Sequence, residues 1–346
     1  MPCIAARSAA PPETPPKIRR SRRSRAPLAV FAVRRAFVGE DAPFVLNCVA
    51  STPDHGESAC RRFPRHGPIG TTQLRTMDCF YINLEGAVNR RRTLEHSFRD
   101  CMNSKWRLYR YRAVDGNYVR RAAIPGTLTD AEKACFLSHR DLIQSSLGNS
   151  EPILVLEDDA ILGSRTCEQL EELVFRRDPS SWDLAFTDFI VPDLACMAGL
   201  LKLRQKLAGE VRLLDLSTLP FAGSTAYLIN GRSKALLAGL LASVTSLDVP
   251  YDLFLRNHIY AKGLTACGFF PFITSLSSLS EQSDIQPTAK TATLIWDAFR
   301  KLSWMDRDIE REKPLLQSIA STLCDEECSA FGTIFAAMLS KAYQPR

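Results

Sequence analysis

The sequence predicts an α/β domain in which helices flank a mostly parallel sheet. After Met77, apolar runs of strand length alternate with segments of helix length, which is the order of parallel strands joined by crossover helices. The run at 153–157 has four apolar residues in succession, as expected for a strand that is covered on both faces. Apolar helical patterning returns within 290–343, for example at Phe299 and Leu302. A C-terminal helical extension is therefore expected.

Three regions are predicted along the 346 residues. Residues 1–76 are rich in Pro, Arg, Ser and Ala and have no sustained period, which predicts a disordered extension. Because regular patterning starts directly after Met77, a translation start at Met77 is a second interpretation of this extension. Residues 77–288 form the predicted α/β domain, and residues 289–346 form the helical region.

Individual elements follow from the local patterns. Thr129 and Glu132 match a capping box that opens a helix, with Cys135, Ser138 and Leu142 along one side. A second helical stretch begins near residue 250. Seven runs are predicted as strands of the sheet: 79–84, 108–114, 153–157, 183–187, 211–216, 226–230 and 264–270.

Composition limits the class of protein. With 45% hydrophobic residues, the chain is able to bury a large core. The net charge of +6 comes from residues 1–76, which hold 13 Lys and Arg against 5 Asp and Glu. The predicted domain therefore has no excess of positive charge, and no nucleic-acid partner is expected for it. A nucleic-acid-binding role is left to the Arg-rich extension alone.

Cysteine usage and hydropathy bear on the compartment. The eleven cysteines are dispersed, mostly within apolar stretches, which suits free thiols in a reducing compartment. The closest pair, Cys324 and Cys328, lacks a second Cys or His pair at zinc spacing and is interpreted as structural. No apolar run reaches the roughly 20 residues of a spanning helix. We expect a cytoplasmic protein, with peripheral contact at the inner face of a membrane left open.

Three adjacent carboxylates end the strand predicted at 153–157. Glu157, Asp158 and Asp159 would lie at its carboxyl end, where parallel sheets bind ligands. Such a cluster is costly unless water or a cation offsets its charge, and a divalent ion with oxygen ligands is the simplest solution. A solvated acidic turn explains the same residues equally well at this point.

The segment Ser138-His139-Arg140-Asp141 invites two catalytic interpretations that the sequence excludes. A kinase catalytic loop would need an asparagine at fixed spacing and a glycine-rich loop before it, and both are missing. A serine hydrolase would need a Gly-x-Ser-x-Gly elbow, which does not occur. His139 is either a hydrogen-bonded helix residue or a ligand contact.

Other polar positions each have a simple structural interpretation beside the functional one. Asp115, followed by glycine, favours a plain turn. Ser224 and its neighbours 223–225 are small and hydroxylic, which suits sugar or phosphate oxygens near the backbone. Tyr227 is a core residue or a stacking platform. Asp252 is a carboxylate favoured near a helix N-terminus, or a functional acid.

Taken together, these segments resemble the family-25 glycosyltransferases, which include bacterial lipooligosaccharide galactosyltransferases and collagen galactosyltransferase domains. Six short motifs occur in the order of that family, and their combination is more specific than any one alone. They are Tyr-Ile-Asn-Leu-Glu at 81–85 with the basic cluster at 90–92, Ala-Val-Asp-Gly at 113–116, Cys-Phe-Leu-Ser-His at 135–139, Leu-Val-Leu-Glu-Asp-Asp-Ala at 154–160, Ala-Tyr-Leu-Ile at 226–229 and Pro-Tyr-Asp at 250–252.

The resemblance implies a GT-A-type, Rossmann-like fold and an inverting, metal-dependent transfer of a hexose, galactose or a related sugar. The donor would be a UDP-sugar and the acceptor a lipooligosaccharide or another cell-surface glycan. Mn²⁺, or Mg²⁺, would bridge the acids to the donor diphosphate. The implied residue roles are metal binding by Glu157 and Asp159, proton acceptance by Asp252 or else Asp188, and nucleotide or sugar contacts by Asn83, Arg90, Asp115, Ser138, His139, Asp158 and Tyr227.

The chain departs from the family pattern in one motif. Ala134 stands where the family usually carries glycine before the cysteine of Cys-x-x-Ser-His. An inactive relative that binds nucleotide sugar or partner proteins is the alternative function. The intact acids weigh against it, because a degenerate site usually loses charges that are costly to hold together.

Overall fold

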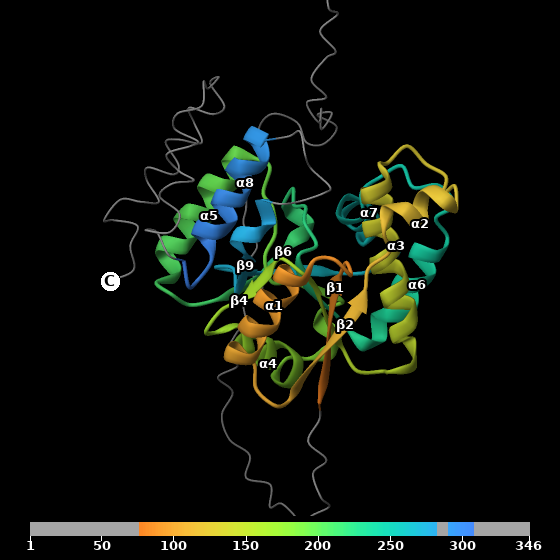
Figure 1. The fold of residues 1–346 in the computed structure, drawn as a ribbon. Coiled ribbons are helices and arrows are strands. Elements are labelled where there is room, and N and C mark those ends of the chain that lie inside the picture. The colour runs from red at the N-terminus through yellow and green to blue at the C-terminus, as the bar shows by residue number, and fades with distance from the viewer. Residues whose placement is uncertain (1–75, 282–289, 308–346) are drawn as a thin grey trace, which may run out of the picture. The chain divides into compact units, whose positions relative to one another are not determined.

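A seven-stranded sheet forms the centre of the protein. The computed structural model describes residues 76–281 and 290–307, all within one compact unit of the chain. Helices cover the sheet on both faces (Figure 1). The strands lie in the order β2-β1-β3-β7-β5-β8-β6. Their bounds are β1 Met77–Asn83, β2 Trp106–Arg112, β3 Ile153–Glu157, β5 Leu184–Phe186, β6 Arg212–Asp215, β7 Ala226–Ile229 and β8 Ala266–Phe270.

The sheet is mostly parallel, as predicted. β1 pairs in parallel with both β2 and β3, and β5 pairs in parallel with β8. Only β7, between β3 and β5, and β6, at the edge, run in the opposite direction. A second sheet pairs β4 (Ala160–Leu162) with β9 (Thr274–Leu276).

All seven predicted strands are confirmed, with ends that shift by at most two residues. The short strands β4 and β9 were not predicted, because three residues are too few to show a period.

Eight α-helices occur in the described part of the chain. The predicted capping box is present at α3, where Glu132 N–H donates to Thr129 Oγ1 at 3.2 Å and Thr129 N–H donates to Glu132 Oε2 at 2.9 Å. The bounds are α1 Val88–Cys101, α2 Gly116–Arg121, α3 Asp130–Ser145, α4 Thr166–Glu171, α5 Leu194–Leu207, α6 Lys234–Ala242, α7 Tyr251–His258 and α8 Lys290–Ser303.

The core has two parts, one on each face of the sheet. Ile153 and Val155 of β3 pack with residues of α3, α6 and α7. Leu154 and Leu156 point to the other face and pack with α1 and α4. The four apolar residues of β3 are fully buried, which confirms the prediction of a strand covered on both faces.

Helix α8 packs on the α/β domain. Phe299 and Leu302 are buried in the core, as their apolar pattern predicted. Arg204 of α5 donates to the carbonyl oxygens of Leu302 and Trp304, and Figure 1 shows α5 and α8 side by side. The predicted disorder of residues 1–76 lies outside the described residues except at residue 76, and the part of the expected helical region beyond residue 307 also lies outside them. The alternative start at Met77 is not tested by the fold.

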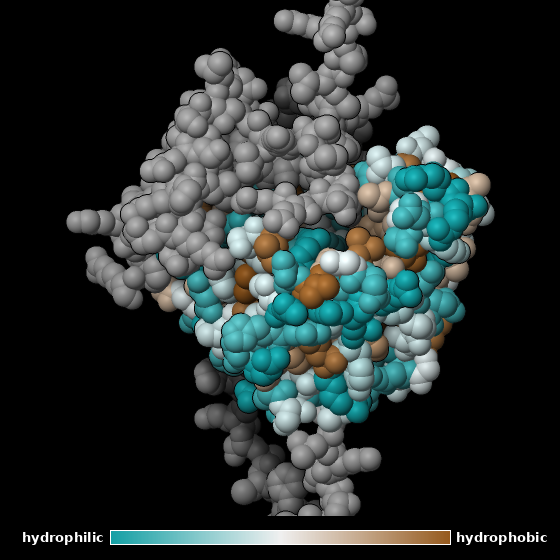
Figure 2. Space-filling view, viewed as in Figure 1, coloured by the Kyte–Doolittle hydropathy of each residue, from teal (hydrophilic) through white to brown (hydrophobic). Residues whose placement is uncertain are grey.

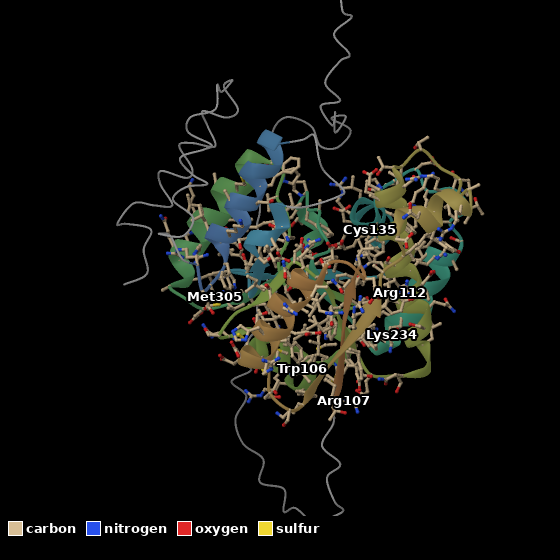
Figure 3. The ribbon with its side chains drawn as sticks, in the orientation of Figure 1. Trp106, Arg107, Arg112, Cys135, Lys234 and Met305 are labelled. Carbon is tan, nitrogen blue, oxygen red and sulfur yellow. The ribbon has the colours of Figure 1, made fainter. Side chains whose placement is uncertain are left out.

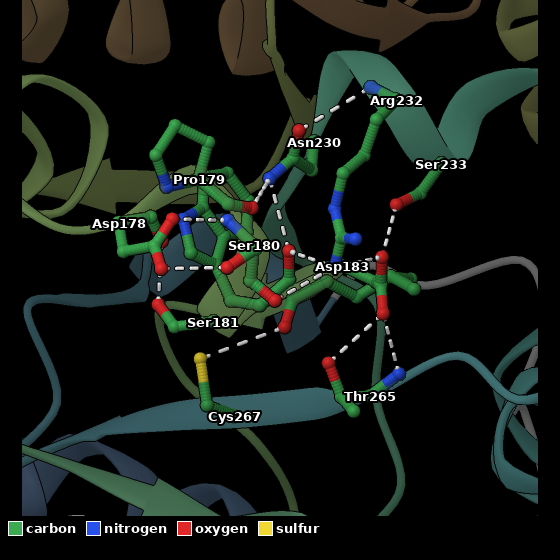
Figure 4. A network of polar contacts seen from close by, with 12 residues as sticks. Asp178, Pro179, Ser180, Ser181, Asp183, Asn230, Arg232, Ser233, Thr265 and Cys267 are labelled. Carbon is green, nitrogen blue, oxygen red and sulfur yellow. Dashed lines mark hydrogen bonds and ion pairs between the residues drawn. The ribbon is translucent and has the colours of Figure 1, made fainter.

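A polar network links β5, β7 and β8 at the end of the sheet opposite the one where β3 stops at Glu157 (Figure 4). Asp183 precedes β5, and its carboxylate accepts hydrogen bonds from Ser233 and from Thr265 N–H and Oγ1 at 2.8 and 2.9 Å. Arg232 forms an ion pair with the same carboxylate at 2.9 Å. Because these residues lie at the starts of β5 and β8 and after the end of β7, the network holds the sheet and lies away from the acidic motif.

On the face shown in Figure 2, hydrophilic residues predominate and apolar residues form small separate groups. No helix within the described ranges has both the length and the apolar character to cross a membrane.

Candidate functional site

The acidic motif lies where β1 and β3 end side by side. The two strands are parallel, with Ile82 opposite Glu157, so Asn83 and the acids share one edge of the sheet. Glu157 continues the alternation of Ile153 and Val155 and faces α3, whereas Asp158 faces α1. Glu157 and Asp158 are thus directed to different partners.

Arg90 on α1 binds both aspartates. Its Nη1 lies 3.1 Å from Asp158 Oδ1 and its Nη2 lies 2.5 Å from Asp159 Oδ2. Asn83 donates to Asp158 Oδ2 at 2.7 Å and accepts from Arg110 Nε at 2.9 Å. The predicted ligand contacts Asn83, Arg90 and Asp158 therefore come together around the acids.

Asp159 has an oxygen without a partner. Its Oδ2 is bound by Arg90, but its Oδ1 is buried and makes no hydrogen bond with any residue that the structure describes. Burial, reinforced by the charges of Glu157 and Asp158, raises the pKa of Asp159 from 3.8 to about 7 despite Arg90. Burial also raises the pKa of Asp158, which Arg90 and Asn83 partly oppose. The site is therefore short of positive charge.

Glu157 is held on the α3 side. Ser224 Oγ donates to Glu157 Oε1 at 2.7 Å, and His139 Nε2 lies 3.5 Å from the same oxygen. Burial alone would raise the pKa of Glu157, but His139, Ser224 and Arg300 together lower it by more. Glu157 is therefore the carboxylate of the motif most firmly kept in its charged form.

The segment 223–225 connects three charged groups. Gly223 N–H donates to Asp252 Oδ2 at 2.8 Å, Ser224 holds Glu157, and Thr225 Oγ1 accepts from Arg300 Nη2 at 2.6 Å. Gly223 has φ +99°, a conformation that side chains rarely adopt, so glycine is needed here. The small, hydroxylic residues predicted as ligand contacts thus organise the carboxylates.

The two candidate bases differ in their surroundings. Asp252, in the first turn of α7, is half-buried, and its oxygens accept from the backbone N–H groups of Gly223 and Leu253. Asp188, after β5, is 1% exposed and pairs with Arg300 at 2.6 Å. Burial raises the pKa of both carboxyls. Only Asp252 retains exposure to solvent.

Three other predicted contacts lie beneath the acids. His139 and Tyr227 are fully buried, and Tyr227 Oη lies 2.9 Å from His139 Nδ1 and 2.8 Å from Tyr251 Oη. Ser138 is 1% exposed; its Oγ donates to the Ala134 carbonyl and accepts from Val114 N–H. These three residues therefore make buried structural contacts next to the acids.

Asp115 lies apart from this group of contacts. It caps α2 by accepting from Tyr118 N–H at 2.7 Å, which is the structural interpretation that its sequence favoured. No contact between Asp115 and the acidic motif is found in the described structure. Its role toward a nucleotide stays a prediction.

A groove of about 540 Å³ lies between α1 and β2. Its walls include Tyr81, Glu95, Arg110 and Trp106, the last of which is labelled in Figure 3. The acids do not line it. Arg110 joins the two places, because it lines the groove and also donates to Asn83.

Sequence reasoning missed three residues of the site. Arg300 comes from α8, beyond the motifs, and its signal is an arginine next to Phe299 and near Leu302 in an apolar helix face. Tyr251 stacks on the His139 ring at a centroid distance of 4.2 Å. It belongs to the Pro-Tyr-Asp motif at 250–252, of which only the aspartate was predicted to have a role. Cys135 lies near the acids and was counted as an ordinary apolar-stretch cysteine.

The site can accept a cation. Five carboxylates (Glu157, Asp158, Asp159, Asp188 and Asp252) influence one another, against the two guanidinium groups of Arg90 and Arg300. The unpartnered, buried Asp159 Oδ1 is an oxygen ligand of the type that hard divalent ions prefer. The residues present therefore fit a Mn²⁺ or Mg²⁺ ion.

The fold and the site define an α/β domain with an acidic centre at the carboxyl ends of its strands. A model of glycosyltransferase family 25 (LPS biosynthesis protein) matches residues 77–255. The chain belongs to this family of glycosyltransferases. No curated protein matches the sequence.

Solved glycosyltransferases show a distant likeness. The glycosyltransferase GlyE of Streptococcus pneumoniae TIGR4 is 12% identical with a TM-score of 0.31, over 55% of this chain and 45% of that one. Mouse xyloside xylosyltransferase 1, apo form, is 11% identical with a TM-score of 0.33, over 55% of this chain and 83% of that one. The chain thus spans less than half of the pneumococcal protein.

Proposed function

We propose that the chain transfers a hexose, galactose or a related sugar, from a UDP-sugar to a lipooligosaccharide or another cell-surface glycan, with inversion at the anomeric carbon. The observation that carries this proposal is the acidic motif of a family-25 domain placed at the carboxyl ends of β1 and β3, with one buried oxygen of Asp159 unpartnered. Its family description, LPS biosynthesis protein, supports the class of acceptor.

Asp159 and Glu157 are the proposed metal ligands. Asp159 supplies the unpartnered Oδ1, and Glu157 is the carboxylate of the motif whose pKa is lowered. When bound there, Mn²⁺ or Mg²⁺ supplies positive charge for the donor diphosphate and for the nucleotide as it leaves.

Arg90 and Asn83 are the proposed donor contacts on the α1 side. The guanidinium of Arg90 already lies against two carboxylates, and it binds Asp159 through the oxygen opposite the unpartnered one. A diphosphate would offer Arg90 the same kind of paired oxygens that the aspartates now offer. Asn83 holds Asp158 in place through its amide and is itself oriented by Arg110.

Asp252 is the proposed general base. The oxygen of the acceptor hydroxyl attacks the anomeric carbon, the bond to the diphosphate oxygen breaks with its electron pair, and the hydroxyl proton passes to the Asp252 carboxylate. A pKa raised by burial suits this proton transfer, and the side chain keeps part of its surface exposed to solvent. Asp188 instead positions Arg300 beneath Thr225.

We further propose that the enzyme works in the cytoplasm, at the inner face of a membrane. A UDP-sugar is a cytoplasmic donor, and a lipid-linked acceptor would present its glycan at a membrane surface. The basic extension at residues 1–76 offers charge for anionic headgroups. Peripheral contact of this kind needs no spanning helix.

The test uses the purified full-length chain with Mn²⁺, a panel of UDP-sugars and lipooligosaccharide acceptors. We expect transfer from one donor, dependence on the divalent ion and inverted stereochemistry in the product. Asp159→Asn should abolish the metal dependence, and Asp252→Asn should lower kcat more than donor affinity.

Asp130→Asn is the matched control, because Asp130 forms an exposed ion pair with Arg120 and takes no part in the site. Full activity of Asp159→Asn would contradict the metal role of the motif. Donor binding without transfer to any acceptor would instead support the inactive relative.

A further inference from the structure

Cys135, His139 and Glu157 bring sulfur, nitrogen and oxygen ligand atoms together beside the acidic motif. Cys135 and His139 are four residues apart on α3, so they lie on the same side of the helix. Glu157 ends β3 directly opposite them. One ligand atom from each residue lies within 4.8 Å of the other two. Figure 3 shows Cys135 on α3.

The imidazole of His139 is held in place by its neighbours, and its Nε2 has only a long contact of 3.5 Å with Glu157 Oε1. The ring stacks on Tyr251 at 4.2 Å with an angle of 8° between the rings, and Nδ1 lies 2.9 Å from Tyr227 Oη. Within the described part of the chain, Nε2 is buried and makes no hydrogen bond. A buried nitrogen without a hydrogen bond is costly, so a closer partner for Nε2 is expected.

The spacing of the ligand atoms suits a tetrahedral ion. Nitrogen and oxygen ligands at about 2.0–2.1 Å from zinc lie about 3.3 Å apart in tetrahedral geometry. His139 Nε2 and Glu157 Oε1 are 3.5 Å apart. The ligand atoms lie within 4.8 Å of one another, so the Cys135 sulfur needs to approach by at most about 1.3 Å to complete the arrangement. Cys135 is only partly buried, so an ion can enter and its side chain can turn.

The supporting residues match what a metal-bound histidine needs. A ligating histidine donates its other N–H to an oxygen, which fixes the tautomer and the ring orientation. Tyr227 Oη stands at that position, and it lies 2.8 Å from Tyr251 Oη, so the hydroxyl groups form a chain behind the ring. Glu157 is oriented in the same way by Ser224.

Charge favours a cation at this place. The carboxylates of Glu157, Asp159 and Asp252 all act on the Cys135 thiol. A divalent ion bound there would offset this negative charge, and Cys135 would bind it as a thiolate.

We propose that Cys135, His139 and Glu157 form a three-ligand site for Zn²⁺, with a fourth position open toward the acidic motif. Thiolate and imidazole ligands select a borderline ion of this kind over Mn²⁺ or Mg²⁺. The site shares Glu157 with the proposed Mn²⁺ ligands but differs from them in its sulfur and nitrogen donors. Its test does not depend on sugar transfer.

The experiment titrates the reduced, metal-stripped full-length protein with Co²⁺ as a spectroscopic substitute for Zn²⁺. We expect a sulfur-to-cobalt charge-transfer band that Cys135→Ser removes and Cys167→Ser, a change at another partly buried thiol, retains. Competition with a chromophoric chelator should show Zn²⁺ affinity at this site reduced by more than about 100-fold in Cys135→Ser. Tyr227→Phe should reduce it by about 10- to 100-fold.

A second measurement needs no variant. Zn²⁺ should slow alkylation of Cys135 in the wild-type protein, measured peptide by peptide by mass spectrometry, and leave Cys167 unaffected. Identical Co²⁺ spectra for the wild type and Cys135→Ser, together with unchanged alkylation of Cys135, would overturn the proposal. A protonated His139 that donates to Glu157 in the presence of Zn²⁺, seen by NMR, would also overturn it.

Discussion

Replacing Asp159 by Asn should make the metal-free protein more stable at pH 8. The carboxyl is 8% exposed, has one oxygen without a partner, and has its pKa raised by burial from 3.8 to about 7. The folded chain therefore holds a proton on Asp159 between about pH 4 and pH 7 that the unfolded chain has lost. Because the folded state binds more protons, stability falls as pH rises through this window.

The size of the effect follows from the shift. A shift of about 3 pKa units corresponds to about 4 kcal/mol of unfolding free energy at pH 8, where both states have lost the proton. At pH 5 Asp159 is ionised only in the unfolded state, and the same reasoning gives a loss of about 1.5 kcal/mol of unfolding free energy. Water near the site lowers both figures, so we expect a gain of about 2 kcal/mol or more at pH 8 and a clearly smaller gain at pH 5.

Urea unfolding of the wild type and Asp159→Asn at both pH values measures this difference. Mn²⁺ should stabilise the wild type at pH 8, because an ion that binds only the folded state adds to its stability, and it should leave Asp159→Asn unchanged. Asp130→Asn is the control and should show no gain at either pH. An Asp159→Asn protein that is no more stable than wild type at pH 8 would refute the reasoning about this carboxyl.

Three further substitutions test the surroundings of the acids. Gly223→Ala should lower the unfolding free energy by about 1–2 kcal/mol and also lower turnover, because it strains the backbone whose N–H holds Asp252. Gly209→Ala is the control: Gly209 has φ +93° with open space around it, so this change should lower stability alone. Arg300→Met should cost about 3–5 kcal/mol by leaving Asp188 as an unpaired buried charge, and adding Asp188→Asn should recover most of it in the same denaturation assay. Arg90→Ala should weaken UDP-sugar binding measured by calorimetry, whereas Arg92→Ala should not, because Arg92 is an exposed neighbour. Equal UDP-sugar affinities of the wild type and Arg90→Ala would show that Arg90 does not bind the donor.

Much of the site was predictable because short-range chemistry marks it. Glu157, Asp158 and Asp159 interrupt an apolar strand, and charges at that position are visible in the sequence without any knowledge of partners. Thr129 and Glu132 specify the start of α3 through contacts three residues apart, and the structure confirms them. Features of this kind depend on residues that are neighbours in the chain.

Contacts between distant segments were not predictable. Arg300 reaches Asp188, 112 residues earlier, and no local pattern indicates which acid a helix arginine will meet. Arg90 was expected to contact a nucleotide, and in the protein it pairs with Asp158 and Asp159. Cys135 became a candidate ligand only when α3 was seen to pack across the end of β3.

By itself, the sequence determined the class of fold, the seven strands and the position of the acidic motif, because side-chain period and composition act over a few residues. Tertiary structure decided which oxygen of Asp159 lacks a partner, which of Asp188 and Asp252 stays open to solvent, and which thiol stands beside His139. These properties depend on burial and on electrostatic fields, which arise only when segments far apart in the chain exclude water together.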